Sequence, residues 1–251
     1  MIIKETKAKD DIDTNFAKYF YAPKLEKAYN IYADSVKTFS APKLKVAWNV
    51  SIYLVKSFFV PKLIKANTIT VPFAKRFFAL NLEEALDIIA SSAEKIFIPK
   101  LKKADRIIAR SAEYFSAPKL IEVTDDIYID SAIGFSVPRL TKAGIIWAKL
   151  ARSFSAPKLT TISTIDVSLV EKFFAPKLKE AGYIWADSAK KFSVPKLIKI
   201  NHIRGESAKE FSVPNLIEAE CIYASSAKSF SAPKLKKTNE IWAVSAETIE
   251  L

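Results

Sequence analysis

Residues 226–238 read SAKSFSAPKLKKT, and residues 111–123 read SAEYFSAPKLIEV. Imperfect copies of this segment occur along the whole chain, which is therefore built from an internal repeat. Neighbouring units are 19 residues apart, except for one step of 20 after Pro118. We predict one solenoid domain over residues 1–251, with an N-terminal cap and first coil (1–22), regular coils (23–232), and a last coil with a C-terminal cap (233–251). Counted from position 1, the units start at Pro23, Pro42, Pro61, Leu80, Pro99, Pro118, Pro138, Pro157, Pro176, Pro195, Pro214 and Pro233.

The apolar residues of the unit indicate its fold. The consensus is P-K-L-x-x-A-x-x-I-x-A-x-S-A-K-x-F-S-A, which is apolar at positions 3, 6, 9, 11, 14, 17 and 19. Gaps of two are typical of short strands whose alternate side chains point inward, and gaps of three indicate corners. The proline breaks any helix and marks one corner. A repeat of two helices is excluded, because it needs about 33 residues per unit.

We therefore predict an all-β fold, a right-handed parallel β-solenoid of about 13 coils of 19 residues. Each coil would stack on the next, so that Phe packs on Phe and Ile on Ile. Positions 8 to 12 form the main strand, with positions 8, 10 and 12 facing outward, and Phe-Ser-Ala before the proline forms a second strand. The extra residue near Asp125 and Asp126 predicts a bulge.

The unit L-x-x-A-x-x-I-x-A-x-S-A resembles short bacterial leucine-rich repeats and the coils of receptor L-type domains, over essentially the whole chain. The resemblance implies a minimal leucine-rich-repeat-like solenoid as the other form of the same fold. It also implies a surface that binds another macromolecule, without catalytic residues. Position 14 holds Ala or Val where the standard repeat, L-x-x-L-x-L-x-x-N, has asparagine, so the asparagine spine of that family is absent.

The outward positions 8, 10 and 12, which we call the strand face, carry aromatic residues together with ten acids and four bases. Interface cores favour Trp and Tyr, so we predict that a protein partner binds here. The other interpretation is that these aromatics pack across strands and stabilise the sheet. The predicted partner-binding residues are Tyr32, Tyr128, Trp147, Lys149, Tyr183, Trp185, Arg204, Tyr223 and Trp242.

Position 2, which follows the proline, is basic in ten of the twelve units and acidic in none. We call these residues the basic column. Such a column either binds a polyanion with strong salt dependence or keeps a β-protein soluble. Single-strand binders interleave aromatic and basic residues, whereas here the two are predicted on different faces. The alternative polyanion-binding residues are Lys24, Lys43, Lys62, Lys100, Lys119, Arg139, Lys158, Lys177, Lys196 and Lys234.

The composition limits which partners, functional sites and cellular location we expect. A formal net charge of +12 suggests anionic partners. The single cysteine, Cys221, excludes a disulfide framework. There is no secretory signal and no apolar run of about 18 to 20 residues, so we expect a cytoplasmic protein and no membrane partner. Cys221 and the single histidine, His202, occupy position 8 of neighbouring units, but no third group orients them. We expect no enzyme, cofactor or metal site.

These observations favour a non-enzymatic interaction module that binds a protein partner, as an adaptor or an inhibitor. A phage or mobile-element origin would suit an inhibitor of a host enzyme. Two alternatives stay open: a nucleic acid or another polyanion on the basic column, and a glycan on the strand face, since aromatic and acidic residues on a solenoid resemble carbohydrate platforms. Exposed end coils would allow an end-to-end homo-oligomer.

Overall fold

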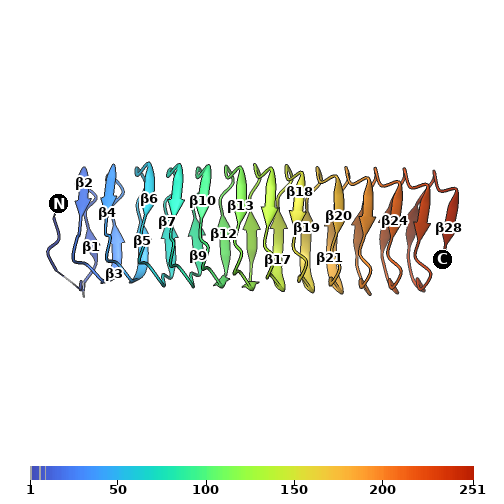
Figure 1. Ribbon diagram of the computed structural model, residues 1–251, viewed down its shortest axis with the longest axis horizontal. Helices are drawn as coiled ribbons and strands as arrows, with labels where there is room; N and C mark the ends of the chain where they lie inside the picture. The colour runs from blue at the N-terminus through green and yellow to red at the C-terminus, as the bar shows by residue number, and fades with distance from the viewer. Residues whose placement is uncertain (1, 6, 9) are drawn as a thin grey trace. The chain divides into compact units, whose positions relative to one another are not determined.

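The computed structural model describes residues 2–5, 7–8 and 10–251, and shows an all-β parallel solenoid of about 13 coils (Figure 1). The chain divides into two compact units, Met1–Ile129 and Asp130–Leu251. The predicted all-β solenoid is confirmed. The predicted cap, 1–22, includes residues 1, 6 and 9, which lie outside the described residues, and the single domain over 1–251 stays a prediction. In the described part of the chain, no helix has the length and apolar character needed to cross a membrane.

Unit 1 has two layers of parallel strands. In the first layer, the hydrogen-bonded order is β1 (Ile12–Asp13), β3 (Lys27–Tyr32), β5 (Val46–Ser51), β7 (Thr68–Thr70), β9 (Asp87–Ile89), β12 (Arg106–Ile108) and β15 (Asp126–Tyr128). The short strands β11 (Lys103–Ala104) and β14 (Glu122–Val123) pair beside it. The second layer contains the pair β2 (Tyr19–Tyr21) and β4 (Thr38–Ser40), and the sheet of β6 (Ser57–Phe59), β8 (Arg76–Phe78), β10 (Lys95–Phe97) and β13 (Tyr114–Ser116).

Unit 2 repeats this arrangement. Its first layer is β17 (Lys142–Trp147), β19 (Thr161–Asp166), β21 (Glu180–Trp185), β23 (His202–Arg204), β25 (Cys221–Tyr223) and β27 (Glu240–Trp242). Its second layer contains the pair β16 (Gly134–Ser136) and β18 (Ser153–Ser155), and the sheet of β20 (Lys172–Phe174), β22 (Lys191–Ser193), β24 (Glu210–Ser212), β26 (Ser229–Ser231) and β28 (Thr248–Glu250).

Each coil turns at two tight corners. At the proline corner the amide of the leucine donates to the alanine before the proline, as from Leu120 to the Ala117 carbonyl at 3.1 Å. At the other corner the position-14 amide donates to position 11, as from Ala227 to Ala224 at 2.9 Å. Proline suits the second position of such a turn, since its φ is fixed and no amide is needed there. No described residue has a positive φ, so the corners need no glycine, which fits a chain with only four.

Position 12 corrects one detail of the predicted strands. The main strands end at position 10, and position 12 lies in the second corner. Pro72 is at position 12 and occupies this turn, where the Ala74 amide donates to the Val71 carbonyl at 3.1 Å. Its neighbour β7 therefore ends at Thr70, as the equivalent strands do in other coils. The turn accepts proline for the same reason that the first corner does.

The core is a set of like-on-like ladders. In unit 1, the rings of Phe20, Phe39, Phe58 and Phe77 follow one another with centroids 4.8, 5.9 and 5.2 Å apart. In unit 2, the rings from Phe135 to Phe230 are spaced 4.5 to 5.7 Å. Leu and Ile columns beside them are almost fully buried. The predicted stacking of Phe on Phe is confirmed within each unit.

A short polar ladder lies where none was predicted. Asn30 donates to Asp11 at 2.9 Å, Asn49 donates to Asn30 at 2.8 Å, and Asn67 donates to Asn49 at 3.4 Å. Asn30 is buried, so each of its hydrogen bonds offsets the cost of removing an amide from water. Position 14 lacks asparagine as the sequence shows, but the first coils build a different asparagine ladder at positions 7 and 8.

The predicted bulge is also present. Val123 pairs with Ala104, 19 residues earlier, whereas Ile127 pairs with Ile107, 20 residues earlier. The extra residue is therefore inserted between Val123 and Ile127. The Thr124 hydroxyl donates to Asp105 at 2.6 Å, and the Asp125 amide donates to the Asp105 carbonyl at 2.9 Å. These bonds hold the insertion against the previous coil, so the core columns resume in register.

Adjacent residues of β20 test the alternation of inward and outward side chains. Phe173 is 1% exposed and its ring lies between those of Phe154 and Phe192, whereas Phe174 is 56% exposed. Phe173→Ala should lower the free energy of unfolding by about 3 to 5 kcal/mol, because it leaves a cavity in the ladder. Phe174→Ala should change it by less than about 1 kcal/mol. Urea unfolding measures both, and equal losses would contradict this inward and outward alternation.

Candidate functional site

The predicted partner-binding residues all come from the first layer or directly follow it. In unit 1, Tyr32 ends β3 and Tyr128 ends β15, with β5, β7, β9 and β12 between them in the strand order, so the two are far apart. In unit 2 the remaining seven come from β17, β21, β23, β25 and β27 or, for Lys149, from the turn after β17, and β19 lies between β17 and β21 in the strand order. They are Trp147, Lys149, Tyr183, Trp185, Arg204, Tyr223 and Trp242.

Four rings in unit 2 form one connected group, which we call the aromatic cluster: Trp147, Tyr183, Trp185 and His202. The two tryptophan rings meet edge to face, with centroids 6.2 Å apart. Tyr183 lies 5.9 Å from Trp185 and stacks on His202 at 5.1 Å. Tyr183 is 37% exposed and the other three rings are half-buried. These side chains therefore form a mixed surface that is packed internally and still open to solvent.

Asp166 lies between the two tryptophans in strand order and is only 3% exposed, although the sequence predicted an outward acid. Its carboxylate accepts a hydrogen bond from the Ser168 hydroxyl at 2.7 Å and lies 3.6 Å from the Lys149 ammonium. The same ammonium lies 4.5 Å from the centre of the Trp147 ring. A carboxylate and an aromatic ring thus both lie close to one cation, and a cation over an aromatic ring is attracted by the ring's electrons.

Asp187 and Arg204 form a second charged pair beside the aromatic cluster. Arg204 Nε lies 3.2 Å from Asp187 Oδ1, but the pair lacks hydrogen-bond geometry, and that buried oxygen has no hydrogen-bond partner among the described residues. Burial raises the pKa of Asp187, and the positive charge of Arg204 opposes this only in part. A hollow of about 430 Å³ beside this pair is lined by Tyr183, Trp185, His202, Arg204, Glu206 and Tyr223.

The Cys221 and His202 strands pair as the spacing suggested, but the two side chains have other partners. His202 Nε2 lies 3.2 Å from a Glu220 carboxylate oxygen and its ring stacks on Tyr183. A hydrogen bond with Cys221, together with partial burial, raises the pKa of Tyr223. Among the described residues, no group of three or more His, Cys, Asp or Glu side chains is arranged to hold a metal ion.

The predicted partner-binding residue Tyr128 has local partners in unit 1. Its hydroxyl donates to Asp126 at 3.1 Å, and the Arg110 guanidinium lies 5.2 Å from its ring centre. Burial and the hydrogen bond to Asp126 raise the pKa of Tyr128. A cation over an aromatic ring therefore occurs on the first layer of each unit.

All ten residues of the basic column are exposed. Other columns in the described chain pair opposite charges between coils, as Lys65 with Glu84 at 2.8 Å and Lys199 with Glu218 at 3.2 Å. No ion pair within 4.0 Å joins a basic-column residue to a described acid. Asn81 and Asn215 interrupt the column, and each accepts a hydrogen bond from the next lysine, Lys100 or Lys234. The column is therefore a row of like charges without paired acids.

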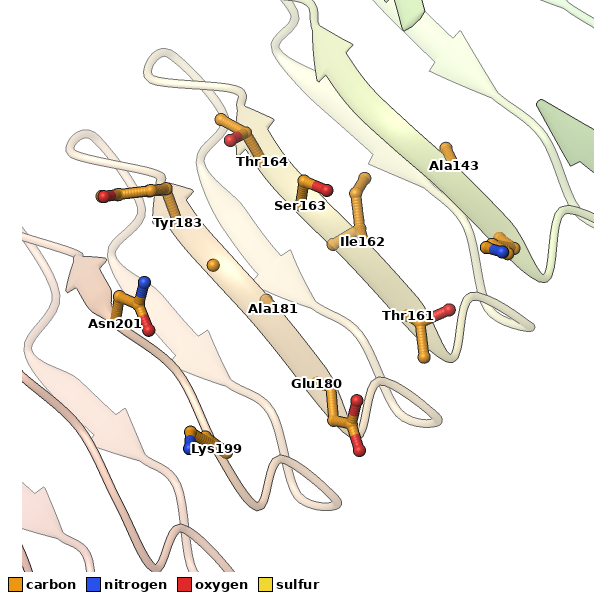
Figure 2. Close-up of a pocket in the computed structure, with 12 residues that line it drawn as sticks. Ala143, Thr161, Ile162, Ser163, Thr164, Glu180, Ala181, Tyr183, Lys199 and Asn201 are labelled. Carbon is orange, nitrogen blue, oxygen red and sulfur yellow. The ribbon is translucent and has the colours of Figure 1, made fainter. Parts of the chain in front are cut away.

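The sequence did not predict an open groove in each unit, beside the strand face at positions 5 to 7. In unit 2 it has a volume of about 510 Å³, with Ala143, Ile162 and Ala181 at its base and Glu180 and Lys199 along one side (Figure 2). In unit 1 it has about 860 Å³ and includes the stacked rings of Tyr29 and Trp48. The groove could have been predicted from position 6, where most units have a small residue, usually alanine. A row of small side chains flanked by longer ones leaves a channel.

A scan against protein-family models matched no family, and searches of curated proteins and of solved structures found no similar protein.

The raised pKa of Asp187 makes a prediction about stability and pH. A raised pKa means that the folded state binds the proton more tightly, so this contribution to stability is present below the ordinary value of 3.8 and is lost as the pH rises through the folded-state pKa. Asp187→Asn should therefore raise the free energy of unfolding at neutral pH, and by less near pH 4. Urea unfolding at both pH values checks this. A less stable variant at neutral pH would show that the ion pair with Arg204 outweighs desolvation.

Gly182 tests the groove of unit 2. A Cβ there would lie 2.6 Å from the Ser163 carbonyl oxygen, so Gly182→Ala should destabilise the fold by about 1 to 3 kcal/mol. Gly205→Ala is the control: its Cβ would meet the Phe192 ring at 3.0 Å, and neighbouring coils carry Ala186 and Ala224 at the same position. We expect it to change stability by less than about 1 kcal/mol, since Ala also restricts the unfolded chain. Thermal unfolding compares them, and a neutral Gly182→Ala would contradict the backbone contact.

Proposed function

We propose that the chain is a non-enzymatic interaction module that binds a protein partner through the strand face of unit 2. The observation that carries the proposal is the aromatic cluster with its flanking charges, because interface hot spots combine Trp, Tyr and Arg in a partly desolvated setting. Trp242, on β27, is 50% exposed and extends this surface beyond Tyr223. Single exposed hydrophobic residues are common on proteins, but a contiguous patch marks an interaction site.

The charge of this surface defines the kind of partner. In unit 2, the acids at positions 8, 10 and 12 outnumber the bases five to two: Asp130, Asp166, Asp187, Glu206 and Glu240 against Lys149 and Arg204. Lys149 already lies against Trp147 and Asp166, as a lysine from a partner would. The proposed partner therefore presents a basic segment whose Lys and Arg side chains bind rings and carboxylates. Complementary charge would raise the association rate and give salt dependence.

A cytoplasmic location and a role as adaptor or inhibitor, with a phage or mobile-element origin for an inhibitor, belong to the same proposal. The single cysteine suits a reducing compartment. A relationship to leucine-rich repeats and receptor L-type domains is proposed from the repeat unit, and parallel coils with buried Leu and Ile columns support it.

The triple variant Trp147→Ala, Trp185→Ala and Trp242→Ala tests the proposal. We expect proteins retained from a host lysate by the native chain to be lost, and the affinity for the identified partner to fall by at least about 100-fold, because hot-spot residues cost about 2 kcal/mol or more each. Trp48→Ala in unit 1 is the control, since Trp48 is about as exposed as Trp242 but lies in the groove. Affinity within twofold of native for the triple variant, with its circular dichroism unchanged, would refute the proposal.

A further inference from the structure

The second layer of unit 1 has a row of exposed phenylalanines on its outer face. Phe59, Phe78 and Phe97 end β6, β8 and β10, and the register pairs Phe59 with Phe78 and Phe78 with Phe97. Phe59 and Phe97 are 51% and 48% exposed, and Phe78 is half-buried. Unlike the core rings, these three share no ring-to-ring contact among the described residues. We call them the outer phenylalanine row, and their surfaces are available for another ring to stack upon.

The solenoid does not need phenylalanine at these positions. The equivalent residue, position 18, is serine in most coils of unit 2: Ser136, Ser155, Ser193, Ser212 and Ser231. Those coils form the same strands with the same inward Phe ladder. The outer phenylalanines therefore add exposed apolar surface without contributing to the core, and such a patch on a soluble protein marks a binding site.

Basic residues lie along both edges of the same layer. Because the strands are parallel and in register, all residues before the strands lie along one edge and all residues after them along the other. The first edge has Lys18, Lys37, Lys56 and Lys75, and the second edge has the basic column, Lys24, Lys43, Lys62, Lys100 and Lys119. All nine are exposed. The two rows of lysines are six residues apart along the chain, so at about 3.3 Å per residue they are separated by at most roughly 20 Å.

The strands themselves add further positive charge between the edges. Arg76 and Lys95 occupy neighbouring strands, β8 and β10, two residues before the outer phenylalanines. Acids are few at these positions, with Glu94 and Glu113 on the first edge, and Glu94 is already paired with Lys75 at 2.8 Å. Tyr19 shows that rings of this layer meet cations, because the Lys18 ammonium lies 5.5 Å from its ring centre. Aromatic and basic residues are thus interleaved on this face.

This arrangement corrects the expectation that aromatic and basic residues lie on different faces. That expectation holds for the first layer, where the outward aromatics accompany acids. It fails for the second layer of unit 1, because β-strand alternation also turns positions 16 and 18 outward, next to the two basic edges.

We propose that the outer face of the second layer in unit 1 binds single-stranded nucleic acid. Bases would stack on the outer phenylalanine row, and phosphates would follow the lysines of the two edges, which is how sequence-tolerant single-strand binders work. A duplex is a poorer match, since its bases are already stacked and its grooves are read by an inserted helix or β-ribbon. Because rows of rings and lysines repeat once per coil, at about 4.8 Å, the face matches a linear polymer.

The test uses the full chain and a fluorescein-labelled oligothymidylate of about 16 nucleotides, followed by fluorescence anisotropy. We expect binding at about 50 mM salt that weakens steeply by about 200 mM, because phosphate contacts release counterions. The triple variant Phe59→Ser, Phe78→Ser and Phe97→Ser should bind at least about 100-fold more weakly, since each of the three stacked bases contributes roughly fivefold or more. Serine is chosen because other coils hold it at this position, and circular dichroism checks that the fold is kept.

Two further variants separate the contributions. Phe174→Ser, the matched control on the second layer of unit 2, should leave affinity within twofold of native. Lys43→Gln with Lys62→Gln should reduce the slope of log affinity against log salt by about 0.7 for each phosphate contact removed.

Three results would overturn the proposal. The first is no oligonucleotide binding at about 50 mM salt. The second is native affinity in the triple phenylalanine variant. The third is binding of the native chain to vesicles containing anionic lipid, lost in that variant, without oligonucleotide binding, because it would assign the same face to a membrane surface. None of these outcomes bears on the strand face of unit 2, whose partner is tested by the tryptophan variants.

Discussion

Backbone hydrogen bonding between coils in a fixed register is the constraint on which the other features of each unit depend. It operates at the corners as well as in the strands: the Lys75 amide donates to the Lys56 carbonyl at 2.9 Å, and the Ala22 amide donates to the Ser40 carbonyl at 2.8 Å. Each residue therefore lies beside its equivalent in the next coil, about 4.8 Å away. The residues at each position of the repeat therefore form a column that runs from coil to coil. Each side chain must be compatible with the side chains directly before and after it in its column.

This constraint places charged residues of neighbouring coils directly beside one another. Like charges on directly opposed positions are destabilising, whereas opposite charges are favourable. The column at position 5 follows this rule, because Lys65 pairs with Glu84 and Lys199 with Glu218. The basic column does not follow it, although acids at position 2 would neutralise it as readily. A local rule broken without an internal gain is expected where a surface is used for binding, and this favours a ligand over solubility as the reason for the column.

The fold could be predicted because the same inward residues and the same corner residues recur in nearly every coil. A proline, a leucine and a phenylalanine at fixed spacing suffice to place two turns and two strands. The candidate site was harder to predict from the sequence. The periodicity distinguishes inward from outward residues, but it does not show which outward residues are covered by their neighbours. Asp166 is at an outward position in the repeat, yet it is buried between Trp147 and Trp185. The repeat pattern does not show that these two large side chains cover it. The outer phenylalanine row was missed because it depends on side chains that vary around the consensus.

Variation around the consensus is therefore where function can change without loss of fold. Strand alternation isolates the outer face of each layer from the core, so that Ser and Phe are interchangeable at position 18. In unit 1 the strand face has five acids and two bases at positions 8, 10 and 12, while the second layer is strongly basic. Packed layers lie about 10 Å apart, and exposed charges are largely screened beyond about 8 Å at physiological ionic strength. Opposite faces of one thin solenoid can thus carry fields of opposite sign, and each face can select its own ligand.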